Sequence, residues 1–196
     1  MVIVGLPCSR LSALKSLVRQ QRRRTKRLGM SSSMAARRLL GEYKQITENP
    51  PEGLTAGPID EENLFEWECL VLGPDSTPYE GGCFHALLSF PKDYPMNPPK
   101  MRFTTPIWHP NIHSDGKVCI SILHAPGEDA TGYERSEERW SPVQSVEKVL
   151  ISVISMMAEP NDESPANVDA AKMWRDDRES FNKVCEDNVK LSLGIS

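Results

Sequence analysis

The spacing of apolar residues along the chain predicts one helix, then a run of strands, then further helices. Apolar side chains recur at helical spacing over residues 35–47, and Asn49-Pro50-Pro51 ends that helix. Alternation of period two predicts strands at residues 54–58, 65–72 and 84–90. Short turns with Gly, Pro and Asp join the strands without a helix between them, which is typical of an antiparallel meander.

The second half of the chain predicts three helices. The segment Ser141-Pro142-Val143-Gln144 has the form of a capping box with proline at the first helical position, so a helix is expected to begin there. Its apolar residues lie almost all round the helix, as expected under a sheet, and Glu159-Pro160-Asn161-Asp162 ends it. Two more helices are expected near residues 167–174 and 176–193. The order of helix, meander and helices predicts an α+β fold.

Length and composition indicate a single domain in a reducing compartment. The chain has 196 residues, 39% of them apolar, which suffices for one core. Its five cysteines include no Cys-x-x-Cys pair, so no disulfide framework or zinc site is indicated, and Cys69 and Cys83 fall in strand patterns. No apolar run is long enough to span a membrane, and residues 1–6 are too short for a signal peptide. We expect a soluble protein that reaches membranes only through a partner.

Charge divides the chain into a basic leader and an acidic body. Residues 1–33 hold eight of the 23 bases and none of the 27 acids, so residues 34–196 have a net charge of −12. Such a body is a poor candidate for binding nucleic acid, which requires Lys and Arg to neutralise phosphates. The leader has the composition of a transit peptide or a basic tail. We expect a disordered extension of the domain at 34–196, or a gene-model artefact with the true start at Met30 or Met34.

Residues 109–123 carry the candidate chemistry. Pro110 fixes φ and removes a donor, so Asn111 is expected on a bend. Ser114-Asp115-Gly116 is a turn signal, which lets Cys119 come back to Asn111. A carboxamide NH₂ close to a sulfur can stabilise an oxyanion on a carbonyl that the sulfur holds. These are parts from which thioester chemistry can be made, with Cys119 as the candidate nucleophile and Asn111 as the candidate oxyanion donor.

These residues also have structural interpretations. A lone cysteine beside apolar residues, as Cys119 is, usually belongs to a core. Asn111 can form an Asx turn, which is compatible with the chemical role. His109 and His113 have the i, i+4 spacing of a metal site, but the proline between them and the glycine after them forbid the helix that such a site requires. No metal is expected.

Three motifs together resemble the E2 ubiquitin-conjugating enzyme family. They are His109-Pro110-Asn111 followed by Cys119, Tyr94-Pro95-Met96-Asn97-Pro98-Pro99-Lys100 before them, and Trp140-Ser141-Pro142 after them. The resemblance runs from about Met34 to the C-terminus. It implies the E2 (UBC) fold, with an N-terminal helix, a four-stranded antiparallel meander and C-terminal helices.

The resemblance implies a thioester mechanism without a cofactor. Cys119 would take ubiquitin from an E1 activating enzyme and pass it to a lysine amine with a RING E3 ligase. Exchange between two thiols needs little activation, because the bond made and the bond broken are alike. For His109 the resemblance implies structural support of the Asn111 loop through hydrogen bonds to backbone.

Two loops are implied as the contact for the ligase RING domain: Pro95, Met96, Ser141, Pro142 and Val143. An exposed methionine is an adaptable contact, and a core position for Met96 is the alternative. For the first helix the resemblance implies that its basic face helps to dock E1 and E3, and a merely solvated face is the alternative. This face carries Arg37, Arg38 and Lys44.

The acceptor lysine must lose a proton, since an amine with a pKa of about 10.4 is protonated at pH 7. Many E2s carry an aspartate at a gate position where this chain has Ser164. We therefore assign the role to its acidic neighbours Asp162, Glu163 and Asp169.

A long acidic insertion separates Cys119 from Trp140, about a dozen residues longer than the connection in most E2s. Because of it the chain resembles the G2 type of the family, which serves endoplasmic-reticulum-associated degradation in the cytosol, at the cytosolic face of that membrane. Five of its residues are acids: Glu128, Asp129, Glu134, Glu137 and Glu138. Beside the thiol they would raise the energy of the thiolate and attract a cationic lysine, with Glu128 and Asp129 as the first candidates. A solvated spacer is the alternative.

Three rival functions are a non-catalytic E2 variant that only binds ubiquitin, an E2 for another modifier such as SUMO or NEDD8, and a thiol hydrolase. The presence of Cys119 argues against the first. The third needs a histidine base within hydrogen-bond reach of the thiol, and the candidate is His109, to which the resemblance gives a structural role. We therefore expect no base beside Cys119.

Overall fold

The computed structural model describes residues 33–60, 62–129, 132 and 134–195. The leader up to residue 32 lies outside this part, so its predicted disorder stays a prediction. The described elements run in the order that the sequence predicts: α2 (Met34–Glu48), β1 (Leu54–Asp60), β2 (Asn63–Leu72), β3 (Cys83–Ser89), β4 (Lys100–Phe103), the 3-10 turn η1 (Ser121–Leu123), α3 (Val146–Ala158), α4 (Val168–Asp176) and α5 (Arg178–Ser192).

The strands form one antiparallel sheet in the order β1-β2-β3-β4. Trp67 on β2 pairs with Pro58 on β1 and with Leu88 on β3, so each strand lies beside its neighbour in sequence. This confirms the meander. The fourth strand has only four residues, with Met101 and Phe103 buried, and so short a pattern gave no periodicity to detect.

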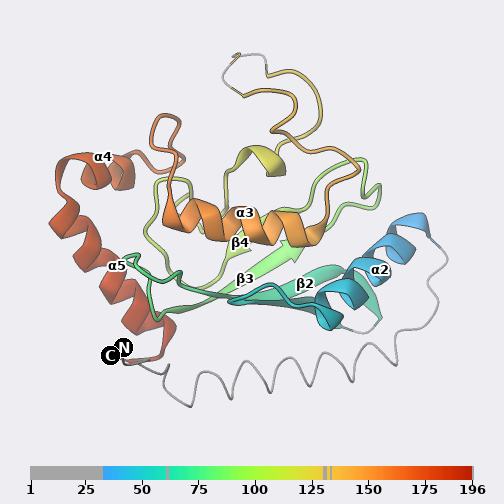
Figure 1. Cartoon of the computed structure of the whole chain (residues 1–196), viewed down its shortest axis with the longest axis horizontal. Helices are drawn as coiled ribbons and strands as arrows, with labels where there is room; N and C mark the ends of the chain where they lie inside the picture. The colour runs from blue at the N-terminus through green and yellow to red at the C-terminus, as the bar shows by residue number, and fades with distance from the viewer. Residues whose placement is uncertain (1–32, 61, 130–131, 133, 196) are drawn as a thin grey trace, which may run out of the picture.

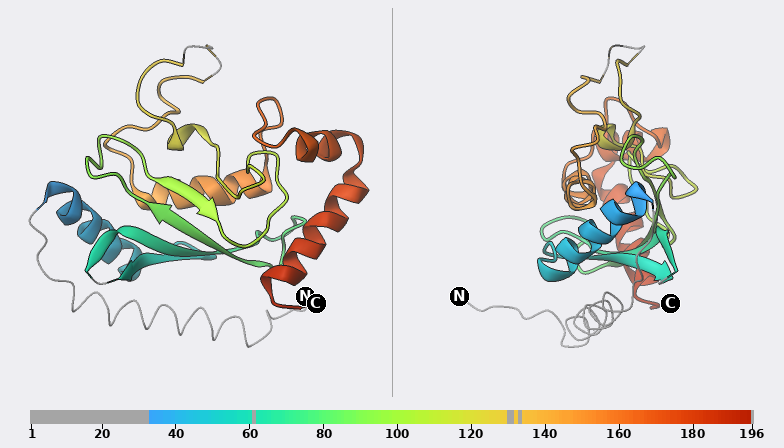
Figure 2. Two further views of the ribbon diagram at one scale, coloured as in Figure 1. Left: turned by 180° about the vertical axis from the view of Figure 1, so that it is seen from behind. Right: turned by 90° about the vertical axis from the view of Figure 1, so that its right-hand side faces the viewer.

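Helix α3 lies across one face of the sheet, with α2 at one end and α4 and α5 at the other (Figures 1 and 2). Its inner face is buried: Val146, Val149, Leu150, Val153, Met156 and Met157. The predicted burial under the sheet is confirmed for this face, whereas Ile151 is 47% exposed although it is apolar. The sheet covers one face of α3 and leaves the other accessible.

Helix α3 begins at Val146, and the prediction of a start at Ser141 was wrong. The N–H of Gln144 donates to Ser141 O at 2.9 Å, which closes a turn ahead of the helix. Ser145 is the N-cap. The buried carboxylate of Glu42, on α2, accepts from the N–H of Val146 at 2.6 Å. A carboxylate from a distant helix thus satisfies this N-terminus, and a local sequence pattern cannot reveal it.

The other predicted elements are confirmed. Helices α4 and α5 occupy the two C-terminal segments, and α2 covers the predicted first helix. Cys69 lies within β2 and Cys83 begins β3, and burial raises the pKa of the Cys69 thiol. Among the described residues, no helix is both long and apolar enough to cross a membrane.

Candidate active site

A tight turn brings Cys119 back to Asn111. Gly116 has a φ of +88°, and a Cβ at this position would lie 2.2 Å from the carbonyl oxygen of Phe103, so the turn requires glycine. The N–H of Gly116 donates to His113 O at 2.8 Å. The N–H of Cys119 then donates to Asn111 O at 2.9 Å, and the predicted approach of the two residues is confirmed.

The carboxamide of Asn111 is held in one orientation. Its Nδ2 donates to Asn161 O at 2.7 Å, and its Oδ1 accepts from Asn161 N–H at 2.9 Å. Asn111 is only 3% exposed, so these bonds hold Asn161, in the segment that follows α3, against the bend formed by His109-Pro110-Asn111. An amide nitrogen carries two hydrogens, and after the bond to Asn161 a second one is left for an oxyanion.

His109 is buried beneath this bend and does not reach Cys119. Its Nδ1 accepts from the N–H of Asn111 at 2.9 Å, and its Nε2 lies 2.9 Å from Met156 O. Burial lowers the pKa of His109 to about 4, so the ring is neutral and donates from Nε2. The hydrogen bonds to backbone expected of His109 are present, and neither nitrogen is free to act as a base.

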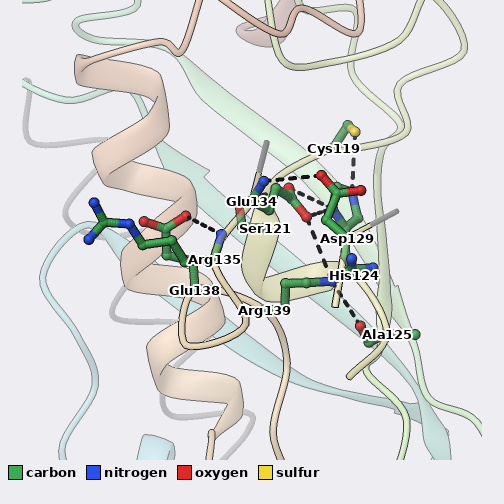
Figure 3. Close-up of polar contacts among 9 residues, drawn as sticks. All are labelled: Cys119, Ser121, His124, Ala125, Asp129, Glu134, Arg135, Glu138 and Arg139. Atoms are coloured by element: carbon green, nitrogen blue, oxygen red, sulfur yellow. Dashed lines mark hydrogen bonds and ion pairs between the residues drawn. The ribbon is translucent and has the colours of Figure 1, made fainter. Parts of the chain in front are cut away.

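A different histidine lies beside the thiol. His124 Nε2 is 3.4 Å from Cys119 Sγ, and both carboxylate oxygens of Glu134 are 2.8 Å from His124 Nδ1 (Figure 3). The expectation that no base stands near Cys119 was therefore wrong. The 3-10 turn η1 turns the chain directly after the cysteine, and the N–H of His124 donates to Ser121 O at 2.9 Å. The signal available in the sequence was a histidine five positions after Cys119, at the start of the insertion.

The insertion delivers Glu134 to this histidine through several contacts. Ser121 Oγ donates to Glu134 Oε1 at 2.9 Å, and Asp129 Oδ2 accepts from the N–H of Glu134 at 3.1 Å. Arg139 Nε is 3.7 Å from Glu134 Oε2. Of the two acids favoured from the sequence, Asp129 thus positions Glu134, whereas Glu128 is exposed and does not line the pocket at the thiol.

The thiol of Cys119 is half-buried, and its environment favours the protonated form. Burial raises its pKa first, the carboxylate of Glu134 raises it further, and the ammonium of Lys117 lowers it. The predicted effect of the insertion on the thiolate therefore comes from Glu134. Because Glu134 binds Nδ1 of His124, the other nitrogen, Nε2, is the natural acceptor of the thiol proton.

A pocket of about 140 Å³ opens beside Cys119. Ten residues line it: Asn111, Cys119, Ile120, Ser121, His124, Glu134, Met156, Glu159, Asn161 and Ser164. The predicted gate residue Ser164 is thus at the site. The acids assigned with it are not among the lining residues: Asp162 pairs with Arg175 at 3.7 Å, while Glu163 and Asp169 are exposed. The carboxylates that do line the pocket, Glu134 and Glu159, were missed as candidates for proton transfer.

The two loops assigned to the ligase lie side by side. Trp140 Nε1 donates to Pro95 O at 2.7 Å, which joins the segment before the active site to the segment before α3. Met96 is 56% exposed and Val143 is 83% exposed, so Met96 is not a core residue. Pro95, Ser141 and Pro142 are partly exposed beside them.

Within the described ranges, no group of three or more His, Cys, Asp and Glu side chains is arranged to hold a metal ion.

Comparison with known proteins agrees with this geometry. The profile of the family described as Ubiquitin-conjugating enzyme matches residues 38–189. The Bos taurus protein named Ubiquitin-conjugating enzyme E2 G2 is 68% identical over 161 residues, which is 82% of this chain and 98% of that protein. The Homo sapiens protein of the same name is 67% identical over the same shares. The Schizosaccharomyces pombe protein named Ubiquitin-conjugating enzyme E2-18 kDa is 59% identical over 166 residues, 85% of this chain and all of that protein. The chain therefore belongs to the ubiquitin-conjugating enzyme family and is an E2 enzyme.

Proposed function

We propose that this E2 accepts ubiquitin from an E1 as a thioester on Cys119 and passes it to a lysine amine with a RING E3 ligase. The observation that carries the proposal is that the Cys119 thiol shares one pocket with a fixed carboxamide and an imidazole. The Nδ2 of Asn111 is oriented by Asn161, and Nε2 of His124 lies 3.4 Å from the sulfur.

Loading begins with removal of the thiol proton. The pKa of Cys119 is raised, so a neighbouring base is needed to form the nucleophilic thiolate. His124 Nε2 takes the proton, with Glu134 stabilising the imidazolium through Nδ1. The thiolate then attacks the thioester carbonyl on E1, and the cysteine sulfur of E1 leaves.

Transfer to lysine uses the same pocket. The carboxylates of Glu134 and Glu159 line it and attract the lysine ammonium. Once the amine is neutral it attacks the thioester carbonyl, and the second N–H of Asn111 Nδ2 donates to the oxyanion. Collapse of this intermediate breaks the C–S bond and leaves ubiquitin on the lysine nitrogen, and the proton that this nitrogen loses passes to the departing sulfur of Cys119.

The proposed partners are supported by the family and by surface features. The exposed side chains of Met96 and Val143 support a ligase contact at the two adjoining loops. A role in degradation at the cytosolic face of the endoplasmic reticulum, reached through a partner, is part of the proposal and rests on the resemblance of the chain to the G2 type.

A charging assay tests the proposal. With E1, ATP and ubiquitin, the full chain should form an adduct that thiol reductant removes. Cys119→Ser should form an ester that survives reductant, and Cys119→Ala should form no adduct. Cys83→Ala, which changes a partly exposed cysteine, is the matched control and should charge normally. Reducible charging of Cys119→Ala would refute the assignment, and charging with SUMO or NEDD8 and their own E1 enzymes in place of ubiquitin would identify a different modifier.

A further inference from the structure

We propose that this enzyme also transfers ubiquitin from Cys119 to hydroxyl acceptors of the serine or threonine type, with His124 as the general base. The inference rests on the proposed function, because it requires the ubiquitin thioester on Cys119. Its basis is the line of three groups from sulfur to imidazole to carboxylate, which transfer to an amine does not by itself require.

The orientation of the imidazole is set by Glu134. Both carboxylate oxygens lie 2.8 Å from His124 Nδ1, so in the neutral ring this nitrogen carries the hydrogen and Nε2 holds the lone pair. Nε2 faces Cys119 Sγ at 3.4 Å (Figure 3). In the thioester the sulfur has no proton to share. Nε2 then remains beside the sulfur that carries the acyl group, where it can take a proton from an acceptor that attacks the adjoining carbonyl carbon.

Amines and hydroxyls differ in how much their attack on a thioester depends on a general base such as His124. A neutral amine attacks a thioester directly and can lose its proton afterwards, whereas a hydroxyl is a weak nucleophile until a base removes its proton during the attack. A neutral imidazole held beside the acyl carbon therefore contributes far more to transfer onto oxygen than onto nitrogen.

The step is a simple exchange of acyl carriers. The hydroxyl oxygen attacks the thioester carbonyl while its proton passes to His124 Nε2, and Asn111 Nδ2 donates to the oxyanion. The C–S bond then breaks, and the imidazolium returns the proton to the sulfur of Cys119. The products are an oxygen ester of ubiquitin and the free thiol, so no further reactant is needed.

The pocket has the size and polarity for a small hydroxyl side chain. Its volume is about 140 Å³, and it brings Ser121, Asn161 and Ser164 to the same opening as Cys119 and His124. The side chain of Ser164 is itself an uncharged hydroxyl, so this part of the lining presents no charge to an acceptor that is uncharged, whereas Glu134 and Glu159 line other parts of the pocket.

Single-turnover discharge tests the inference. The full chain is charged with ubiquitin by E1 and ATP, E1 is stopped with EDTA, and the charged enzyme is mixed with N-acetyl-threonine amide or, separately, with Nα-acetyl-lysine amide. The ubiquitin product is identified by intact mass, and cleavage by hydroxylamine identifies the ester. The unchanged enzyme should form both products. In His124→Gln, ester formation should fall about 10²-fold or more, and discharge onto lysine should fall by less than about tenfold.

Two further variants sharpen the test. Glu134→Gln should lower ester formation, since it removes the charge that stabilises the imidazolium. Glu138→Gln should not, because Glu138 is exposed, does not line the pocket and, in the described part of the chain, accepts from the N–H of Arg135 at 3.4 Å.

The outcomes separate this inference from the proposed function. Absence of any thioester would refute the proposed function itself. Normal charging and normal lysine product with no threonine ester would overturn the inference alone. Equal losses for both acceptors in His124→Gln, or an undiminished ester rate, would overturn the role of His124 as a base for oxygen.

Discussion

Replacing Glu42 by glutamine should destabilise the domain by about 3 kcal/mol. Glu42 forms an ion pair with Arg38, and we take the low end of the range for breaking a buried pair because the Arg38 side chain is 36% exposed. Glu42 itself is only 6% exposed. Its Oε1 accepts from Arg38 and, at 2.8 Å, from the hydroxyl of Tyr94, and its Oε2 accepts from the N–H of Val146 at 2.6 Å. Glutamine offers one acceptor oxygen and turns an NH₂ toward another donor, so at least one donor is left unpaired.

The same carboxylate ties together the parts of the proposed ligase surface. Arg38 also donates to Gln144 O at 2.8 Å, next to the loop that leads into α3. Tyr94 precedes Pro95, whose carbonyl accepts from Trp140 at 2.7 Å. Loss of the carboxylate therefore loosens both loops at once. Discharge stimulated by a RING ligase should fall more in Glu42→Gln than discharge without a ligase.

Thermal unfolding and discharge assays check these two effects. For a domain of this size a loss of 3 kcal/mol corresponds to a decrease in Tm of about 6–12 °C. Glu48→Gln, at the exposed end of the same helix, is the control and should change stability by less than about 0.5 kcal/mol. A Tm for Glu42→Gln equal to that of Glu48→Gln would refute the energetic argument. Equal losses with and without ligase, measured well below both Tm values, would refute the link to the ligase surface.

Three further predictions concern the active site. Asn111→Ala should slow transfer to lysine about 10²–10³-fold while charging by E1 changes little, and equal loss of both steps would mean that its bonds to backbone matter only for folding. Because the pKa of His109 is lowered from 6.5 to about 4, its contribution to stability should be complete above pH 6.5 and decline, by up to about 3 kcal/mol, as the pH falls toward 4. Urea unfolding at several pH values should show this slope, and His109→Asn should lack it. The pH midpoint for alkylation of Cys119 should lie above that of a free thiol, move up in Lys117→Met and move down in Glu134→Gln; no movement in either variant would contradict the electrostatic assignment.

The sequence predicted those features that depend on local chemistry. Gly116 and the residues before it specify a turn, and a turn of that length returns Cys119 to Asn111 whatever surrounds it. The strands β2 and β3 and the helix α2 follow from periodicity because one face of each is buried in a single core. The support that His109 gives to the bend came from the family resemblance, since no spacing rule leads to it.

The errors fall where distant segments meet. Helix α3 begins at Val146 because Glu42, more than one hundred positions earlier in the chain, supplies an acceptor. Proton acceptors for the pocket were sought next to Ser164, but that segment directs Asp162 toward Arg175 on α4. Proximity in sequence was in both cases a poor guide to proximity in space.

The insertion acts at the thiol through one carboxylate more than through its total charge. Glu128, Glu137 and Glu138 are exposed, where water and salt screen their effect on the sulfur. Glu134 is partly buried, bonded to His124 and Ser121, and alone among the five acids raises the pKa of Cys119. The N–H of Trp140 donates to His124 O at 3.1 Å, so this hydrogen bond joins the two ends of the insertion. A direct connection from His124 to Trp140 would leave Nδ1 without this carboxylate, so the proposed role of His124 as a base depends on the insertion that supplies Glu134.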